Sequence, residues 1–350
     1  MGEYFPDKGA LGGYLAQQAG INTETLEITK FTGGYSNLTY LLTLDGGRKL
    51  VMRRPPVGAN IKSGHDMHRE YRLLSALHPA GLRVPEPVLY CRDAGIIGAE
   101  FYVMEYADGV ILRAGRKNED IPSAGDMQKA YNALVGMFAG VHGTDYLHCG
   151  LGDLGNPENY PERQITGWSK RYMAAKTDQV DAVEKLMGWL NSHIPAYSGA
   201  ALIHNDFKYD NLVYDAGTWE IRAILDWEMS TIGDPLMDLG CSLGYWVDRD
   251  DPDWLIAINP GPTLWPGSPS REQFVQDYAL RTGRDPGNAV FYFAYGMFRL
   301  AVIAQQIYAR YRAGYTSDPK FASLNKVVES CGFMGMQAVE RKKIDRLFWT

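Results

Sequence analysis

The fold of this chain is decided by the segment LIHNDFKYDNLVYD at residues 202–215 and by IRAILDWE at residues 221–228. Apolar residues on both sides of a turn-forming AGT sequence predict an antiparallel hairpin. With the turn centred near residues 218–219, Asn211 faces Asp226 across the hairpin. A register slip of one residue would still leave both side chains at the same mouth of the hairpin.

Polar residues at that mouth predict a magnesium site with a catalytic base beside it. Asn211 and Asp226 offer an amide and a carboxylate oxygen, which suit a hard cation that completes its shell with water and phosphate oxygens. Asp206 arrives from the preceding loop and could orient an acceptor hydroxyl and take its proton. Lys208 could add positive charge beside the phosphate. Capping of a loop is the alternative, since Asp and Asn are common turn formers.

Three motifs resemble the aminoglycoside phosphotransferase and choline kinase family, and they are HNDFKYDNL at 204–212, LDWE at 225–228 and GDPLMDL at 233–239. The resemblance runs from about Phe31 to the last helices and implies a protein-kinase-like fold that uses ATP and Mg²⁺. In that family the residue matching Asp206 is the catalytic base. The residues matching Asn211 and Asp226 hold the metal.

Short strands followed by helices predict an α+β protein with two lobes. Residues 26–104 contain short β-type runs separated by turns, whereas later segments mostly show helical periodicity. The resemblance implies an N-terminal nucleotide-binding lobe with an antiparallel sheet and a helix at residues 1–104 and a hinge at 105–109. A larger, mostly helical catalytic and acceptor-binding lobe follows at 110–350. Helices are predicted over residues 65–77, 124–142, 165–176, 178–194, 235–243, 271–282, 288–312 and 321–347.

A glycine-containing segment lies where the family's nucleotide loop is found, between two predicted strands. It includes Gly33, Gly34 and Ser36, and glycines there would let backbone N–H groups approach a phosphate. An ordinary hairpin turn is the alternative. Because the Ser36 hydroxyl and the following strand match the family, we expect these three residues to bind the nucleotide.

Arg53 stands where kinases carry the strand lysine that pairs with the nucleotide phosphates, and Glu70 is its expected ion-pair partner. Arginine departs from the family pattern because it offers a bidentate fork, and the sequence leaves open whether Arg53 or Arg54 faces the cleft. A solvated helix face is the alternative for Glu70. Main-chain groups at Glu105 and Tyr106 are expected to hydrogen-bond adenine, although any strand edge could do so.

Two residues are expected to support the catalytic loop from behind. His204 should hold the loop by packing and hydrogen bonds, and Asp238 resembles the family residue that braces it. Asp234, followed by proline, predicts a helix N-cap. Glu228 is expected to brace the site or face solvent. His142 has no partner pattern in the sequence, so a surface or helix-end role is expected.

The acceptor is expected to be a small molecule with a hydroxyl group. Residues 245–265 interleave aromatic and acidic side chains, which could cover a cationic aminoglycoside or choline, but a solvated acidic turn is the favoured interpretation. The aromatic run at 291–308 and the Trp-Glu pair at 227–228 resemble a subgroup of the family that is also found fused to acyl-CoA dehydrogenases. That likeness favours a hydroxy-acid or hydroxyacyl acceptor over an antibiotic.

Composition excludes several other classes of function. A net charge of −6 over 350 residues argues against a nucleic-acid partner, which would require clustered Lys and Arg. Four scattered cysteines suit neither a zinc site nor a disulfide framework and favour the cytoplasm, and the N-terminus lacks a secretory pattern. Residues 289–304 are interrupted by Arg299 and are shorter than the roughly 20 residues of a membrane span, so they predict a buried helix.

Two other functions remain open on sequence alone. A catalytically silent nucleotide-binding protein would share the fold, and a metal-dependent hydrolase could use the same carboxylates. Retention of Asp206, Asn211 and Asp226 together favours an ATP-dependent phosphotransferase. The sequence leaves open the acceptor, the choice between ATP and GTP, and the oligomeric state.

Overall fold

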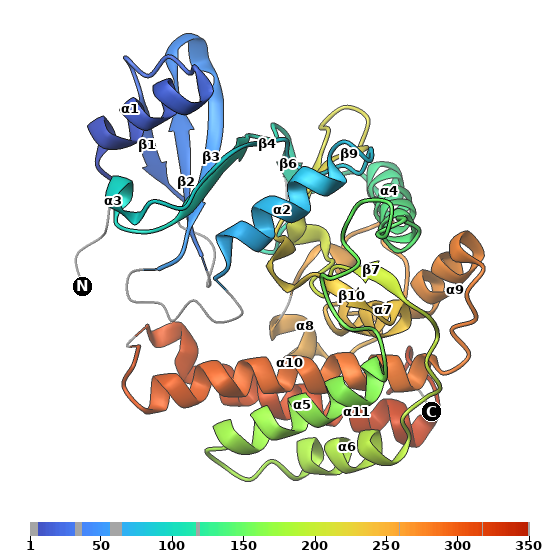
Figure 1. Cartoon of the computed structure of the whole chain (residues 1–350). Coiled ribbons are helices and arrows are strands. Elements are labelled where there is room, and N and C mark those ends of the chain that lie inside the picture. Colours follow the sequence, from blue (N-terminus) through green and yellow to red (C-terminus); the bar gives the residue numbers. More distant parts are fainter. Residues whose placement is uncertain are drawn as a thin grey trace.

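The computed structural model describes residues 6–31, 37–56, 65–116, 120–258, 260–316 and 318–348. Within them the chain forms a lobe built on a sheet and a larger lobe built mainly of helices (Figure 1). The predicted two-lobed α+β architecture is confirmed.

The N-terminal lobe contains an antiparallel sheet in the order β1-β2-β3-β5-β4, drawn in blue and teal in Figure 1. Its strands are β1 (Glu27–Lys30), β2 (Leu38–Thr43), β3 (Lys49–Arg54), β4 (Pro87–Cys91) and β5 (Phe101–Glu105). The β2–β3 hairpin turns through Gly46 and Gly47, whose φ angles of 70° and 81° favour glycine. This turn lets β3 return antiparallel to β2.

Alternation along β3 decides which arginine faces the cleft. Leu50 and Met52 point into the core under α1 (Lys8–Ala19) and α3 (Ala94–Ile97), whereas Val51 packs with the core beneath α2 (Met67–Leu77). Because side chains alternate along a strand, Arg53 lies on the same face of β3 as Val51. Both residues line the cleft between the lobes. On the opposite face, the Arg54 guanidinium donates to the carbonyl oxygens of Pro55 and Ile97.

The larger lobe surrounds two small sheets with helices. One sheet has the order β6-β8-β9 and the other pairs β7 with β10. The strands are β6 (Val110–Ile111), β7 (Ala201–Ile203), β8 (Leu212–Tyr214), β9 (Ile221–Ile224) and β10 (Thr231–Gly233). The helices are α4 (Ala124–His142), α5 (Tyr160–Ala175), α6 (Asp181–Ser192), α7 (Pro235–Gly244), α8 (Asp253–Ile258), α9 (Arg271–Thr282), α10 (Ala289–Arg312) and α11 (Leu324–Arg341).

Helix α10 crosses the larger lobe beside α5, α7 and α11 (Figure 1). By length and composition it could span a membrane, but 72% of its most apolar window is buried inside the protein, as expected of a core helix. Gly296 of α10 meets Gly240 and Gly244 of α7 so closely that a side-chain carbon there would collide with backbone. This close approach places the middle of α10 against α7.

The β8–β9 hairpin differs from its predicted register by one residue. Leu212 pairs with Ile224, and the backbone N–H of Leu225 donates to the Asn211 carbonyl oxygen at 2.8 Å. Asn211 therefore lies opposite Leu225, not opposite Asp226 as predicted. The turn accounts for the difference, because it is centred between residues 217 and 218, with Asp215 paired to Glu220, and not near 218–219 as predicted. An irregularity between Val213 and Tyr214 then recovers one of the two residues of offset. Asn211 and Asp226 nevertheless line the same cleft.

Candidate active site

Asp206 lies at the centre of a compact polar cluster in the loop between β7 and β8. The Lys208 ammonium donates to both of its carboxylate oxygens at 2.9 and 3.0 Å, and the Tyr245 hydroxyl donates at 2.7 Å. The Asn211 amide donates to Asp206 Oδ2 at 2.9 Å. Burial disfavours ionisation, but Lys208 and Tyr245 outweigh it, so the pKa of Asp206 lies below its usual range. The carboxylate is therefore ionised at neutral pH.

Asp238 braces this loop from behind. Its carboxylate accepts the backbone N–H groups of His204 and Asn205 at 2.7 and 2.8 Å. The fully buried His204 contacts the Leu225 carbonyl oxygen through Nε2 at 3.0 Å, and burial lowers its pKa. His142, at the end of α4, is also buried and lies 3.1 Å from Asp238. A surface role for His142 is therefore excluded, because it shares a buried network with the loop.

Asp226 ends the hairpin in a left-handed backbone conformation with φ 65° and ψ 59°. Such angles are uncommon outside glycine and turn the chain sharply after β9. The Asp226 side chain keeps 37% of its surface exposed and, like Asn211, lines the cleft. Two oxygen-bearing side chains of the types that Mg²⁺ binds thus face the same space as Asp206.

Arg53 connects the two lobes through carboxylates on both sides. Its guanidinium lies 3.3 Å from Glu70, 3.0 Å from Asp226 and 3.5 Å from Glu228. Burial opposes its charge, but these carboxylates, Glu70 first, raise the pKa of Arg53. The Asn37 amide donates to both Glu70 and Glu228, at 2.9 and 3.1 Å. Glu70 is therefore a buried ion-pair partner and not part of a solvated helix face.

The hinge residues Glu105 and Tyr106 line the cleft, but their backbone N–H groups already have partners. Glu105 donates to the Glu86 carbonyl oxygen at 2.8 Å and Tyr106 donates to that of Lys49 at 3.3 Å. Adenine contacts to these residues would therefore have to use other main-chain atoms.

The predicted phosphate-loop residues lie outside the described part of the chain. They are Gly33, Gly34 and Ser36.

Residues of both lobes line one cleft of about 830 Å³. Arg53, Glu105 and Tyr106 line it from the N-terminal side, and Asp206 and Arg299 line it from the other lobe. The space is large enough for a nucleotide with a small acceptor.

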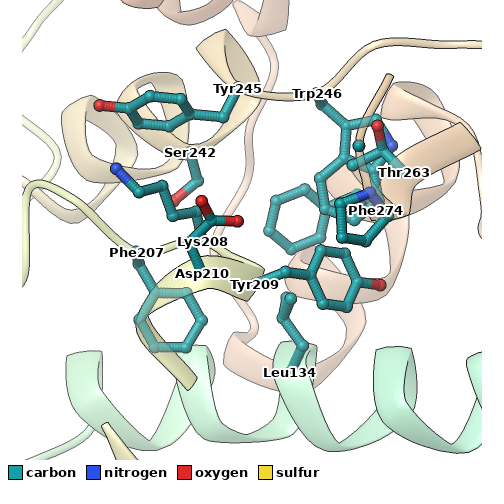
Figure 2. Close-up of a pocket in the computed structure, with 12 residues that line it drawn as sticks. Leu134, Phe207, Lys208, Tyr209, Asp210, Ser242, Tyr245, Trp246, Thr263 and Phe274 are labelled. Carbon is teal, nitrogen blue, oxygen red and sulfur yellow. The ribbon is translucent and has the colours of Figure 1, made fainter. Parts of the chain in front are cut away.

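A second pocket of about 140 Å³ adjoins this cleft, because Lys208, Asp210 and Tyr245 line both. Figure 2 shows these residues together with a set of aromatic rings that includes Trp246 and Phe274. Burial raises the pKa of Asp210 despite the nearby Lys208. The pocket therefore extends the space beside the catalytic loop.

The segment after α7 is only partly the solvated acidic turn that its composition suggested, since Asp250 and Asp253 are exposed. Asp248 and Asp251 are buried, and both pair with Arg271 at the start of α9. Trp246 is buried as well, with its ring stacked on Phe274. The favoured interpretation was wrong for Asp248 and Asp251, because acidic residues in sequence carry no sign of a distant arginine.

Sequence analysis missed three residues that the fold brings to the site. Asn37 and Tyr102 both donate hydrogen bonds to Glu70, and Tyr245 donates to Asp206. Their only signal is position: Asn37 follows the glycine-containing segment and Tyr245 follows the α7 motif. The partners in these three contacts are 33, 32 and 39 residues apart in the sequence, so no local pattern reveals the contacts.

The profile of the phosphotransferase enzyme family, APH, matches residues 27–272, which is well over half of the chain. This chain belongs to the phosphotransferase enzyme family. A member of the same fold, the GDP complex of aminoglycoside 2′-phosphotransferase-IIIa, aligns with a TM-score of 0.62 and 14% identity over 93% of this chain and 99% of that one. At that identity the likeness concerns the fold alone.

Other matches are more similar in sequence. A Ralstonia eutropha structure, named as a candidate aminoglycoside phosphotransferase, is 31% identical with a TM-score of 0.81, covering 96% of this chain and 99% of that one. Acyl-CoA dehydrogenase family member 10 of Mus musculus is 35% identical, covering 92% of this chain and 30% of the relative. Family member 11 of Rattus norvegicus is 37% identical, with coverage of 86% and 39%.

The chain thus spans less than half the length of these curated relatives. The predicted resemblance, including the link to acyl-CoA dehydrogenases, is confirmed.

Proposed function

We propose that this chain is an ATP- and Mg²⁺-dependent phosphotransferase that moves the γ-phosphoryl group to a hydroxyl of a small molecule. One observation carries the proposal: in a member of a phosphotransferase family, ionised Asp206 faces the same cleft as Asn211 and Asp226. Proteins of the same fold support it, since one was solved with GDP and another with AMP-PNP and hygromycin B.

Asp206 is the proposed base. Its carboxylate would orient the acceptor hydroxyl and take its proton while the new bond forms between the acceptor oxygen and the γ-phosphorus. The bond from that phosphorus to the β-γ bridging oxygen breaks, and ADP leaves. Lys208, held 2.9 Å from Asp206, would place positive charge beside the transferred group.

Asn211 and Asp226 are the proposed Mg²⁺ ligands, and their chemistry fits that ion. In the described part of the chain no group of three His, Cys, Asp or Glu side chains could hold a metal, which argues against a zinc-like cage. Mg²⁺ suits fewer protein ligands because substrate phosphates and water complete its shell. When bound, it neutralises charge on the phosphates. Arg53 already contacts Asp226 and would share that carboxylate with the ion.

The nucleotide would lie between the lobes. Arg53, which pairs with Glu70, would contact its phosphates, and main-chain atoms of Glu105 and Tyr106 would contact its base. Gly33, Gly34 and Ser36 complete the proposed nucleotide site. The acceptor would enter from the helical lobe, as a hydroxy acid, a hydroxyacyl compound, an aminoglycoside or a similar alcohol.

Substitution of Asp206 by asparagine tests the proposal. The change keeps the shape of the side chain but removes the base, so we expect ADP release with an acceptor to fall by about 10²–10⁴. Nucleotide affinity, measured by titration with ADP and Mg²⁺, should change far less than the rate of transfer, because Asp206 is proposed to contact the acceptor and not the nucleotide. Asp250→Asn is the matched control, because Asp250 is exposed and does not line the cleft.

Two outcomes would reject this function. Unchanged transfer by the Asp206→Asn variant would remove Asp206 from the role of base. Nucleotide binding by the unsubstituted protein with no turnover on any alcohol would favour a silent binding protein, and steady phosphate release without an acceptor would favour a hydrolase.

A further inference from the structure

Arg299 lies in the middle of α10, on the helical side of the cleft, and is 3% exposed. It lines the cleft together with Asp206 and Tyr245, the residues of the catalytic cluster. The contact between α7 and α10 at glycine residues places it there. Arg299 therefore faces the part of the cleft where an acceptor hydroxyl must lie to reach Asp206.

Nothing in the described part of the chain neutralises this buried cation directly. No carboxylate oxygen of a described residue forms an ion pair with Arg299, and its Nη1 is buried without a hydrogen-bond partner. The Trp168 ring lies 5.4 Å from its guanidinium carbon. Asp206 attracts it electrostatically but is already bonded to Lys208 and Tyr245.

A buried charge without a partner is costly, so an arrangement of this kind is expected where a ligand supplies the missing anion. Arginine suits a carboxylate because its planar fork can donate two parallel hydrogen bonds. Next to it, Trp168, Ile303 and Ile307 line the cleft and offer apolar surface to a carbon chain. A cationic acceptor would instead be repelled by Arg299.

We propose that Arg299 binds a carboxylate of the phosphate acceptor, so that the acceptor is a hydroxy acid held between Arg299 and Asp206. The proposal rests on the proposed function and narrows its acceptor class. The hydrocarbon between the two polar groups would lie along Trp168 and the isoleucines of α10. Arg299 would determine specificity and take no part in proton transfer.

Matched acceptors test the proposal. We would measure ADP release with a hydroxy carboxylic acid, its neutral amide and the amino alcohol of the same chain length. For the unsubstituted protein, the acid should have the highest kcat/KM. In Arg299→Gln, KM for the acid should rise by about tenfold to hundredfold, as expected when a charged hydrogen bond is lost, whereas KM for the amide should change by less than about threefold. Arg299→Lys should recover part of the preference for the acid.

Arg171→Gln is the matched control, since the Arg171 guanidinium lies 4.6 Å from the same Trp168 ring but is exposed and outside the cleft. It should leave the ranking of acceptors unchanged. Equal losses on acid and amide in Arg299→Gln would overturn the proposal and make Arg299 a positioning residue for Asp206. Weaker ADP binding in that variant would overturn it in favour of a contact to nucleotide phosphate.

Binding without turnover separates this proposal from the proposed function. With ADP and Mg²⁺ present, the hydroxy acid should raise the unfolding temperature of the unsubstituted protein and of Arg171→Gln, but not that of Arg299→Gln. Without ligand, Arg299→Gln should unfold at an equal or higher temperature, because it no longer buries an unpaired charge. Protection of the Arg299→Gln variant by the acid would reject the proposal, whatever the result of the phosphate-transfer assay.

Discussion

Arg271 and Arg299 are both buried in the helical lobe, but they differ in what neutralises them. Arg271 lies 2.6 Å from Asp251 and 3.2 Å from Asp248, and its Nη1 donates to the Trp246 carbonyl oxygen at 3.0 Å. Arg299 has no such partner among the described residues. The charge of Arg271 is neutralised by groups of the protein, whereas the charge of Arg299 is neutralised only when a ligand binds.

Burial alone therefore does not indicate whether a charged residue stabilises the fold or binds a ligand. The carboxylate and carbonyl partners of Arg271 hold the segment after α7, the start of α9 and the C-terminal segment together, since Arg271 Nε also donates to the Ile344 carbonyl oxygen at 2.6 Å. Arg53 lies between these cases, because its carboxylate partners belong to the protein and one of them is the proposed metal ligand Asp226.

The largest effect is expected for Arg271→Met. The change leaves Asp248 and Asp251 buried without their cation, so the free energy of unfolding should fall by about 3–5 kcal/mol. Urea denaturation followed by circular dichroism measures it. Arg281→Met is the control, because Arg281 lies on the same helix but is exposed and should shift stability by only about 0.5 kcal/mol. A similar small change for both variants would show that the Arg271 network contributes little.

A smaller change in stability is expected when the pH is varied. Burial raises the pKa of Asp248 to about 7, although Arg271 opposes the shift. The folded protein therefore binds a proton that the unfolded chain has already released, and stability should fall as pH rises between these two pKa values. As pH rises from about 5 to 7, the ionisation of Asp248 alone should lower the free energy of unfolding by about 2 kcal/mol.

Asp248→Asn provides the control for this pH dependence, because its side chain cannot titrate. Its unfolding free energy should change less over the same pH range than that of the unsubstituted protein. Parallel curves for the two proteins would mean that Asp248 ionises normally in the folded state.

The smallest effect is expected for Glu70→Gln. Arg53 loses one carboxylate but keeps Asp226 and Glu228, so unfolding free energy should fall by only about 1 kcal/mol. Thermal and urea denaturation would measure the change. If stability falls as much as in Arg271→Met, Arg53 depends on Glu70 alone. Asp226 and Glu228 would then not compensate for the lost carboxylate.

Local pattern predicted the parts of the site that lie close together in the sequence. The HNDFKYDNL and LDWE motifs placed Asp206, Asn211 and Asp226 around one hairpin, and the structure brings all three to one cleft. The register was wrong by one residue because the turn is centred one position earlier than predicted, and the sequence AGTW does not mark its centre sharply. The α1 helix was not predicted, since its apolar residues Leu11 and Leu15 become meaningful only beneath the sheet.

The sequence alone determined the family, the two-lobed α+β architecture and the residue types of the candidate site. These properties depend on short-range spacing, because a strand alternates every second residue and a hairpin returns the chain to its start. The tertiary structure decided which charges are paired. The Arg53–Asp226 ion pair joins residues 173 positions apart, and the isolation of Arg299 depends on which side chains from other helices do not reach it. Electrostatic energy follows distance in space and exclusion of water, and the order of residues encodes neither until the helices pack.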